Sequence, residues 1–237
     1  MSTYLELCQT LVREGAISGT LSTTVGATGE HLRVTNWIIS AWKDIQTMRD
    51  DWGFMRSSYF NGGGASFTTV ASTSRYTLGS GSGTVGVTAA NFTRWDRDSF
   101  RYYNTTSGVS SEVPMTWIDY DVWRDAYMLG AQQSVNTVPV VVAIAPDMTV
   151  CVPPTLAGYT IRADYWRAPQ VFSANADEPT GLPSRFHDLI WWKALKDHGY
   201  YKAAPEVLQR AREGYRDLMG VLQEQYRPEV YMEGALA

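Results

Sequence analysis

The chain has 237 residues, of which 44% are hydrophobic and only 19% are charged, so it can bury the core of one large domain or of two smaller ones. Its formal net charge of −4 argues against a protein that grips nucleic-acid phosphates, because such proteins need clustered Lys and Arg. The low charge and the 13% aromatic content favour a surface that packs against other subunits.

Three further features narrow the class of protein. The two cysteines, Cys8 and Cys151, provide neither a disulfide framework nor a zinc site, and we expect both to be buried. Residues 1–15 contain acids and no apolar run, so we expect no signal peptide. The longest aliphatic run, residues 138–145, is too short for a membrane helix. We therefore predict a protein made in a cytoplasm, without a membrane partner.

Residues 1–53 predict two helices. The first has Ser2 or Thr3 as its N-cap and Gly15 as its stop. Its apolar positions at helical spacing are Leu5, Cys8, Leu11 and Val12. After a loop rich in Ser, Thr and Gly, a longer helix is expected from about Glu30 to Asp51. Its apolar stripe consists of Val34, Trp37, Ile38, Ala41, Ile45, Met48 and Trp52.

Residues 54–167 predict an inserted antiparallel β-domain, because glycine-rich turns alternate with short runs of β-branched and aromatic residues. The turns lie at residues 61–64, 79–83 and 107–108. The expected strands include residues 66–70, 87–95, 99–104, 116–120 and 159–166. Alternation in the last of these runs places Tyr159, Ile161, Ala163 and Tyr165 on one face.

Residues 168–226 predict two more helices. The first begins with Ser184 as its N-cap and runs to about Tyr201, and the second begins at Pro205. The apolar stripe of the second helix consists of Leu208, Ala211, Tyr215, Leu218, Leu222 and Tyr226. Each stripe needs a partner, so we expect an α+β fold in which helices from both chain ends form a bundle around the point of insertion. Residues 227–237 are expected to form an extended tail.

Two motifs that would indicate ligand chemistry fail in their context. Residues 81–86 match the spelling of a dinucleotide-binding loop, but a strand follows them where a helix is needed, so we interpret them as a hairpin loop. His187 and His198 would lie about 16 Å apart on one helix, too far to share a metal ion. We expect surface or interface positions for them, and we predict no metal and no cofactor.

Carboxylate and tryptophan pairs leave a polysaccharide-active site open. The carboxylate candidates are Asp50 with Asp51, Asp119 with Asp121, and Asp177 with Glu178, although no sequence feature marks a sugar cleft around them. Trp191 and Trp192 would suit a stacking platform. Alternatively, adjacent helical residues diverge by about 100°, so one tryptophan would face the bundle core and the other a neighbouring chain.

Three motifs stand between Ala163 and Tyr201. They are DYWRAP at residues 164–169, DEP at 177–179 and LPSRFHDLI at 182–190, the last continuing into a Trp- and Tyr-rich helix. Together they resemble the head-to-tail adaptor proteins of tailed bacteriophages, especially those of short-tailed phages. The two N-terminal helices and the β-rich middle agree with that family in outline.

The resemblance implies a structural, non-enzymatic virion protein at the head–tail neck. Such adaptors assemble as a ring, usually of twelve copies, beneath the portal protein. They connect the portal to the tail nozzle or tail tube, and genomic DNA passes through the channel during ejection without specific binding. The β-domain, with its glycine-rich loops, would face the next tail component.

The resemblance also assigns two sets of residues. The C-terminal extension of such adaptors reaches back to the portal, and the matching portal-binding residues here are Tyr226, Arg227, Val230, Tyr231, Met232 and Leu236. The helix from Ser184 to Tyr201 would line or brace the ring through Phe186, Ile190, Trp191, Trp192 and Leu195. Two other functions stay open, namely a polysaccharide-active or polysaccharide-binding tail protein and another neck or tail-completion protein.

Overall fold

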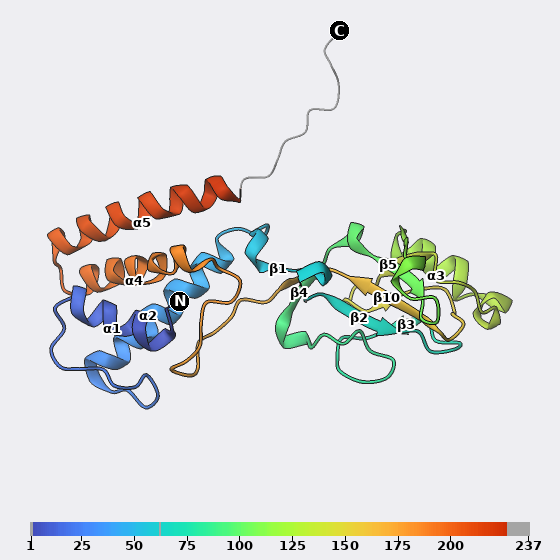
Figure 1. Cartoon of the computed structure of the whole chain (residues 1–237), viewed down its shortest axis with the longest axis horizontal. Helices are drawn as coiled ribbons and strands as arrows, with labels where there is room; N and C mark the ends of the chain where they lie inside the picture. The colour runs from blue at the N-terminus through green and yellow to red at the C-terminus, as the bar shows by residue number, and fades with distance from the viewer. Residues whose placement is uncertain (1, 62, 227–237) are drawn as a thin grey trace, which may run out of the picture. The chain divides into compact units, whose positions relative to one another are not determined.

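The computed structural model describes residues 2–61 and 63–226, which fall into two compact units (Figure 1). One unit comprises the chain up to Phe54 and from Pro169 onward, and the other comprises Met55–Ala168. The first unit is helical and is built from both chain ends, whereas the second is rich in β-strands. The predicted α+β fold, a helical bundle with an inserted antiparallel β-domain, is confirmed.

Four helices form the first unit: α1 (Tyr4–Glu14), α2 (Gly29–Thr47), α4 (Asp188–Tyr201) and α5 (Pro205–Gln225). Helix α4 contacts the other three, and α5 lies along it (Figure 1). The predicted ends of α1 are correct. Thr3 and Glu6 form a reciprocal capping box at its start, and Gly15 follows its last turn. Pro205 occupies the first turn of α5, as predicted.

Helix α2 ends at Thr47 and not at Asp51, because the chain folds back after it. The indole N–H of Trp52 donates to the carbonyl of Ile45 at 2.8 Å, and Arg49 forms an ion pair with Asp51 at 2.7 Å. Trp52 is therefore fully buried without belonging to the helix. Met48, the other residue of the predicted stripe beyond Thr47, is 44% exposed.

A column of aromatic rings runs through the core of the helical unit. Tyr4 stacks on Phe172 at 5.0 Å between ring centroids, Phe172 stacks on Trp42 at 6.1 Å, and Trp42 stacks on Phe54 at 6.2 Å. Phe54 also stacks on Trp52 at 5.4 Å. These rings come from α1, α2 and the segments on either side of the insertion, so aromatic packing ties both chain ends together.

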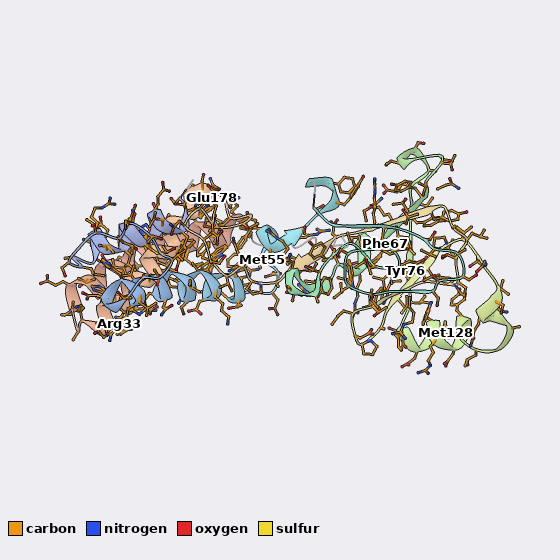
Figure 2. The ribbon with its side chains drawn as sticks, turned by 90° about the horizontal axis from the view of Figure 1, so that it is seen from below. Arg33, Met55, Phe67, Tyr76, Met128 and Glu178 are labelled. Atoms are coloured by element: carbon orange, nitrogen blue, oxygen red, sulfur yellow. The ribbon has the colours of Figure 1, made fainter. Side chains whose placement is uncertain are left out.

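The second unit contains three small sheets. Their strands are β1 (Arg56–Ser57), β2 (Ala65–Thr68), β3 (Arg75–Tyr76), β4 (Phe92–Trp95), β5 (Arg101–Asn104), β6 (Val113–Pro114), β7 (Thr116–Trp117), β8 (Val141–Ile144), β9 (Val150–Cys151), β10 (Tyr159–Ala163) and β11 (Tyr165–Arg167). The sheet orders are β1-β11-β4, β2-β10-β5-β6 and β3-β9-β8-β7. All pairs are antiparallel except β7 with β8. At its core, Phe67 and Tyr76 pack with ring centroids 4.8 Å apart (Figure 2).

Several predicted strands are shorter in the structure. The run at residues 87–95 is a strand only from Phe92, and the run at 99–104 only from Arg101. The run at residues 116–120 ends at Trp117, and a helix that the sequence analysis missed, α3 (Tyr120–Tyr127), follows it. Asp119 occupies the N-cap position of α3, where a short acidic residue favours helix initiation.

The predicted continuous strand at residues 159–166 is interrupted at Asp164, which lies between β10 and β11. Its carboxylate accepts the backbone N–H of Tyr59 at 2.9 Å and forms an ion pair with Arg56 at 3.0 Å. Because Asp164 is buried, these partners fix the chain where it passes from one sheet to another. Tyr165 consequently lies in a different sheet from Tyr159, Ile161 and Ala163.

No helix within the described part of the chain is both long and apolar enough to cross a membrane. Cys8 and Cys151 are buried, as predicted, and burial raises the pKa of the Cys8 thiol to about 12 and that of Cys151 to about 11. Both side chains therefore stay as neutral thiols inside their units.

Candidate functional site

The segment that resembles head-to-tail adaptors returns to the helical unit at Pro169, and the next residue, Gln170, joins it to α2. Gln46 and Gln170 bond reciprocally: the Gln46 side-chain amide accepts the backbone N–H of Gln170 at 2.7 Å and donates to its carbonyl at 3.0 Å. The Gln170 side chain accepts the indole N–H of Trp42 at 3.2 Å and the backbone N–H of Thr180 at 2.8 Å. Gln46 is buried, so these bonds satisfy groups that would otherwise be costly.

The DEP turn holds the start of α1. The carbonyl of Asp177 accepts the backbone N–H of Tyr4 at 2.7 Å, and that of Asn175 accepts the N–H of Leu5 at 3.2 Å. The Asp177 carboxylate accepts the backbone N–H groups of Ser173 and Ala174 at 2.6 and 2.8 Å. These hydrogen bonds lower the pKa of Asp177. The ionised carboxylate of Asp177 therefore stabilises the backbone conformation of residues 173–177.

His187 joins the two ends of the helical unit. Its Nδ1 accepts the backbone N–H of Ser2 at 3.1 Å, and its Nε2 lies 3.1 Å from the carbonyl oxygen of Leu182. The side chain is only 2% exposed. The expected surface or interface position is therefore wrong for His187, because both ring nitrogens are used to hold the N-terminus against α4.

Helix α4 does not begin at Ser184 as predicted. A short 3₁₀ turn, Ser184–Phe186, precedes it, and the α-helix starts at Asp188. Asp188 accepts the indole N–H of Trp191 at 3.0 Å. That bond fixes the tryptophan at the start of the helix, where a carboxylate also complements the helix dipole.

The five residues assigned to this helix lie mostly inside the bundle. Phe186, Ile190, Trp191 and Leu195 are buried. Trp192 is half-buried and stacks on Trp191, with ring centroids 3.9 Å apart. Its ring lies against Gly214 of α5, where an added Cβ would come within 2.6 Å. Trp191 therefore faces the bundle core, as expected for one member of the pair, and Trp192 lies between Trp191 and α5.

An aromatic group anchors the end of α5, from which the predicted tail begins. Tyr226 lies edge-on to Trp52 and Phe54, with centroids 6.2 and 5.7 Å apart. Arg185 donates to the side chain of Gln225 beside it. The other predicted portal-binding residues lie outside the described residues: Arg227, Val230, Tyr231, Met232 and Leu236.

His198 lies near the C-terminal end of α4, whereas His187 lies just before its start. Like His187, it is buried, so its expected surface or interface position is wrong too. Its ring lies edge-on to Trp37 at 5.5 Å, and a Cβ on Gly15 would come within 3.1 Å of it. Neither ring nitrogen has a hydrogen-bond partner among the described residues. Burial, with a smaller contribution from Lys202, lowers the pKa of His198 below its usual 6.5.

Three further carboxylate candidates, Asp51, Asp119 and Asp121, have neighbours within their own units. Asp51 pairs with Arg49, Asp121 pairs with Arg124, and Asp119 stands at the start of α3. Within the described residues, no group of three or more His, Cys, Asp or Glu side chains could hold a metal ion.

The sequence analysis missed one arginine-rich region on the β-rich unit. Arg56 bridges two carboxylates, Asp96 at 2.6 Å and Asp164 at 3.0 Å. In the β1-β11-β4 sheet, Arg56 and Arg94 stand on either side of Trp166 in register. The only sequence signal was the run RWDRD at residues 94–98. Its charges gain their partners only through the fold, which places Arg94 beside Trp166 and Asp96 beside Arg56.

The family model described as SU10 adaptor protein matches residues 2–235, which is nearly the whole chain. A search of curated proteins finds no match. The matched region includes both chain ends, the inserted β-rich unit and the Ala163–Tyr201 segment. The resemblance to head-to-tail adaptors is thereby confirmed, and that family is a structural one. The chain belongs to the SU10 adaptor protein family, a family of phage head-to-tail adaptors.

Proposed function

We propose that this protein forms a ring, usually of twelve copies in such adaptors, at the virion neck, and that the ring joins the portal to the tail nozzle or tail tube. The observation that carries the proposal is the family match over residues 2–235. The helical unit supports it, because the buried polar bonds of Gln46, Gln170 and His187 make a rigid body of the two chain ends. A rigid body suits a part that must hold a fixed place in an assembly.

The tail that follows Tyr226 is the portal-binding element in this proposal. Tyr226 packs on Trp52 and Phe54, so the tail starts from a defined point on the bundle. Tyr231, Met232 and Leu236 supply large apolar side chains for grooves on the portal, with Val230 beside them and Arg227 at the start. Apolar and aromatic anchors of this kind commonly dominate the binding energy of a protein interface.

DNA passes through the ring without specific binding in this proposal. The formal net charge of −4 supports that role, because a channel that held phosphates tightly would slow the passage of DNA. The β-rich unit is the part that contacts the next tail component.

Capture by purified portal rings tests the proposal directly. We expect the full-length protein to sediment with portal rings and to appear as an added ring by negative-stain microscopy. Deletion of residues 227–237 is expected to abolish capture while the circular dichroism spectrum and the melting temperature stay unchanged. Normal capture of the truncated protein would rule out the tail as the portal-binding element.

A matched pair of substitutions separates the tail's apolar anchors from its charge. We expect Met232→Asp with Leu236→Asp to lose capture, and Glu233→Gln to retain it. Location in the virion separates this function from that of another neck or tail-completion protein. Antibody labelling of intact particles should place the chain between portal and tail, and labelling at the distal end of the tail would overturn the adaptor role.

A further inference from the structure

A pocket of about 520 Å³ opens on the β-rich unit beside the β1-β11-β4 sheet. Its lining combines cationic, aromatic and aliphatic side chains: Arg94, Trp95, Asp96, Arg97, Ile144, Met148 and Trp166. The indole N–H of Trp95 donates to the carbonyl of Met148 at 2.9 Å, which holds Trp95 against the turn between β8 and β9. Met148 itself is 40% exposed. The Trp95–Met148 hydrogen bond therefore fixes part of the pocket wall, and the pocket is open to solvent.

Two exposed arginines of this pocket are held in place by aromatic rings. The Arg94 guanidinium lies 4.8 Å from the centroid of Trp166, and that of Arg97 lies 4.7 Å from the centroid of Trp117. The Arg97 guanidinium, stacked in this way, keeps its N–H edge available for a carboxylate. Arg97 makes no ion pair with any residue of the described chain. Asp96, the acid of the pocket, is already paired with Arg56 at 2.6 Å.

Helix α5 carries a stripe of complementary charge. Glu206, Glu213, Asp217 and Glu224 are all exposed. At 100° per residue they fall within about 20° of a single line. The buried residues of α5, Ala211, Met219 and Leu222, occupy the opposite side of the helix. The acidic stripe therefore faces away from the bundle that α5 covers.

The two units differ in net charge. The β-rich unit contains eight arginines, no lysine and eight acids, so its net charge is zero. The whole chain has 20 basic and 24 acidic residues, which leaves 12 basic and 16 acidic residues for the helical unit. The net charge of −4 is carried by the helical unit, which includes the acidic stripe.

We propose that the arginine–tryptophan pocket of one copy, defined by Arg94, Arg97, Met148 and Trp166, receives the acidic stripe of α5 from a second copy. The two surfaces differ, so the contact is head-to-tail and each copy offers one of each. Such heterologous contacts generate rings when the rotation closes. This inference rests on the proposed ring function and supplies the surfaces that the ring uses.

The same pocket is less suited to DNA. A phosphate-binding surface needs a surplus of cations along the path of the backbone. The β-rich unit carries as many acids as arginines, so it offers no such surplus, whereas one exposed arginine such as Arg97 is enough to pair with a single carboxylate of a helix. Arginine and tryptophan are instead the residue types enriched in the centres of protein–protein contacts.

Charge reversal with analytical ultracentrifugation tests the contact. We expect the wild-type protein to self-associate at low salt and high concentration, and the association to weaken as salt rises. Arg97→Glu and Asp217→Arg are each expected to weaken self-association at least about tenfold. An equimolar mixture of the two variants restores association, because the Asp217→Arg copy presents an intact pocket, the Arg97→Glu copy presents an intact stripe, and those two surfaces bind each other.

Two exposed controls isolate the contact from net charge. Arg124→Glu removes an arginine of the same unit that lies on α3, and Gln223→Arg adds a cation to α5 away from the stripe. Neither is expected to change self-association by more than about twofold. Wild-type protein that stays monomeric under all these conditions, or variants that associate like the wild type, would overturn the proposal.

Two further measurements separate the alternatives. A short duplex DNA that binds the wild type, releases with Arg97→Glu and leaves self-association unaffected would assign the arginines to phosphates and refute the contact. Portal capture is measured on the same proteins at a concentration below self-association. Loss of capture by the wild type would count against the adaptor role, whereas arginine-dependent self-association would still support the contact between copies.

Discussion

The indole ring of Trp192 lies directly over Gly214, so that α4 and α5 approach each other where α5 has no side chain. A Cβ on Gly214 would lie 2.6 Å from Cε2 of Trp192, closer than van der Waals contact permits. The ring cannot easily yield, because it stacks on Trp191 at 3.9 Å. We expect Gly214→Ala to lower the free energy of unfolding by about 1–2 kcal/mol, since overpacking outweighs the gain in helix propensity.

Gly220 provides the matched control in the same helix. An added Cβ there meets no atom within 4 Å, and the residue is exposed. Gly220→Ala is therefore expected to raise the free energy of unfolding by about 0.5–1 kcal/mol through helix propensity alone. Urea denaturation followed by circular dichroism measures both changes. Equal effects of the two substitutions would contradict the packing role of Gly214.

In the β-rich unit, Asp164 holds the chain in place where it passes from β10 to β11. It is buried between β10 and β11, accepts the Tyr59 N–H and pairs with Arg56. Asp164→Ala leaves that N–H without its partner and removes the ion pair, so we expect a loss of about 2 kcal/mol in stability. Amide hydrogen exchange of the strands β1, β10 and β11, followed by mass spectrometry, should show faster exchange there.

An exposed carboxylate of the same unit serves as the control for Asp164. Asp125 pairs with Arg124 on α3, and both side chains are about half exposed or more. Asp125→Ala is expected to change stability by less than about 0.5 kcal/mol. If the two substitutions destabilise the unit equally, Asp164 does not hold the passage between the two sheets.

Local features predicted the helices well, and contacts between distant residues account for the errors. Thr3, Gly15 and Pro205 act through neighbouring residues, so the sequence alone indicated the limits of α1 and the start of α5. By contrast, the end of α2 depends on Trp52 folding back onto Ile45. No propensity scale contains that contact.

The candidate site shows the same division. The motifs of the Ala163–Tyr201 segment could be recognised in the sequence, but the long-range hydrogen bonds that hold the segment in place could not. Gln170 bonds to Gln46 across 124 positions, and His187 bonds to Ser2 across 185. Glutamine and histidine at such positions look like surface residues until their partners are known. The arginine–tryptophan pocket could not be predicted from the sequence either, because the pairing of distant strands brings its residues together.

His198 gives the helical unit a predictable dependence on pH. Burial lowers the pKa of its imidazole below 6.5, and neither nitrogen has a partner within the described residues. A base whose pKa is lower in the folded state is protonated first in the unfolded chain. The free energy of unfolding should therefore fall as pH drops below about 6.5, and level off once the pH passes below the folded pKa.

His198→Phe separates this effect from the titration of other groups. Phenylalanine keeps an aromatic ring against Trp37 and removes both unpartnered nitrogens, so we expect equal or greater stability at pH 8. Between pH 6.5 and the folded pKa of His198, the variant should lose less stability than the wild type. Urea denaturation across this range measures the difference. An unchanged slope would show that another titratable group carries the dependence, because all the others remain in the variant.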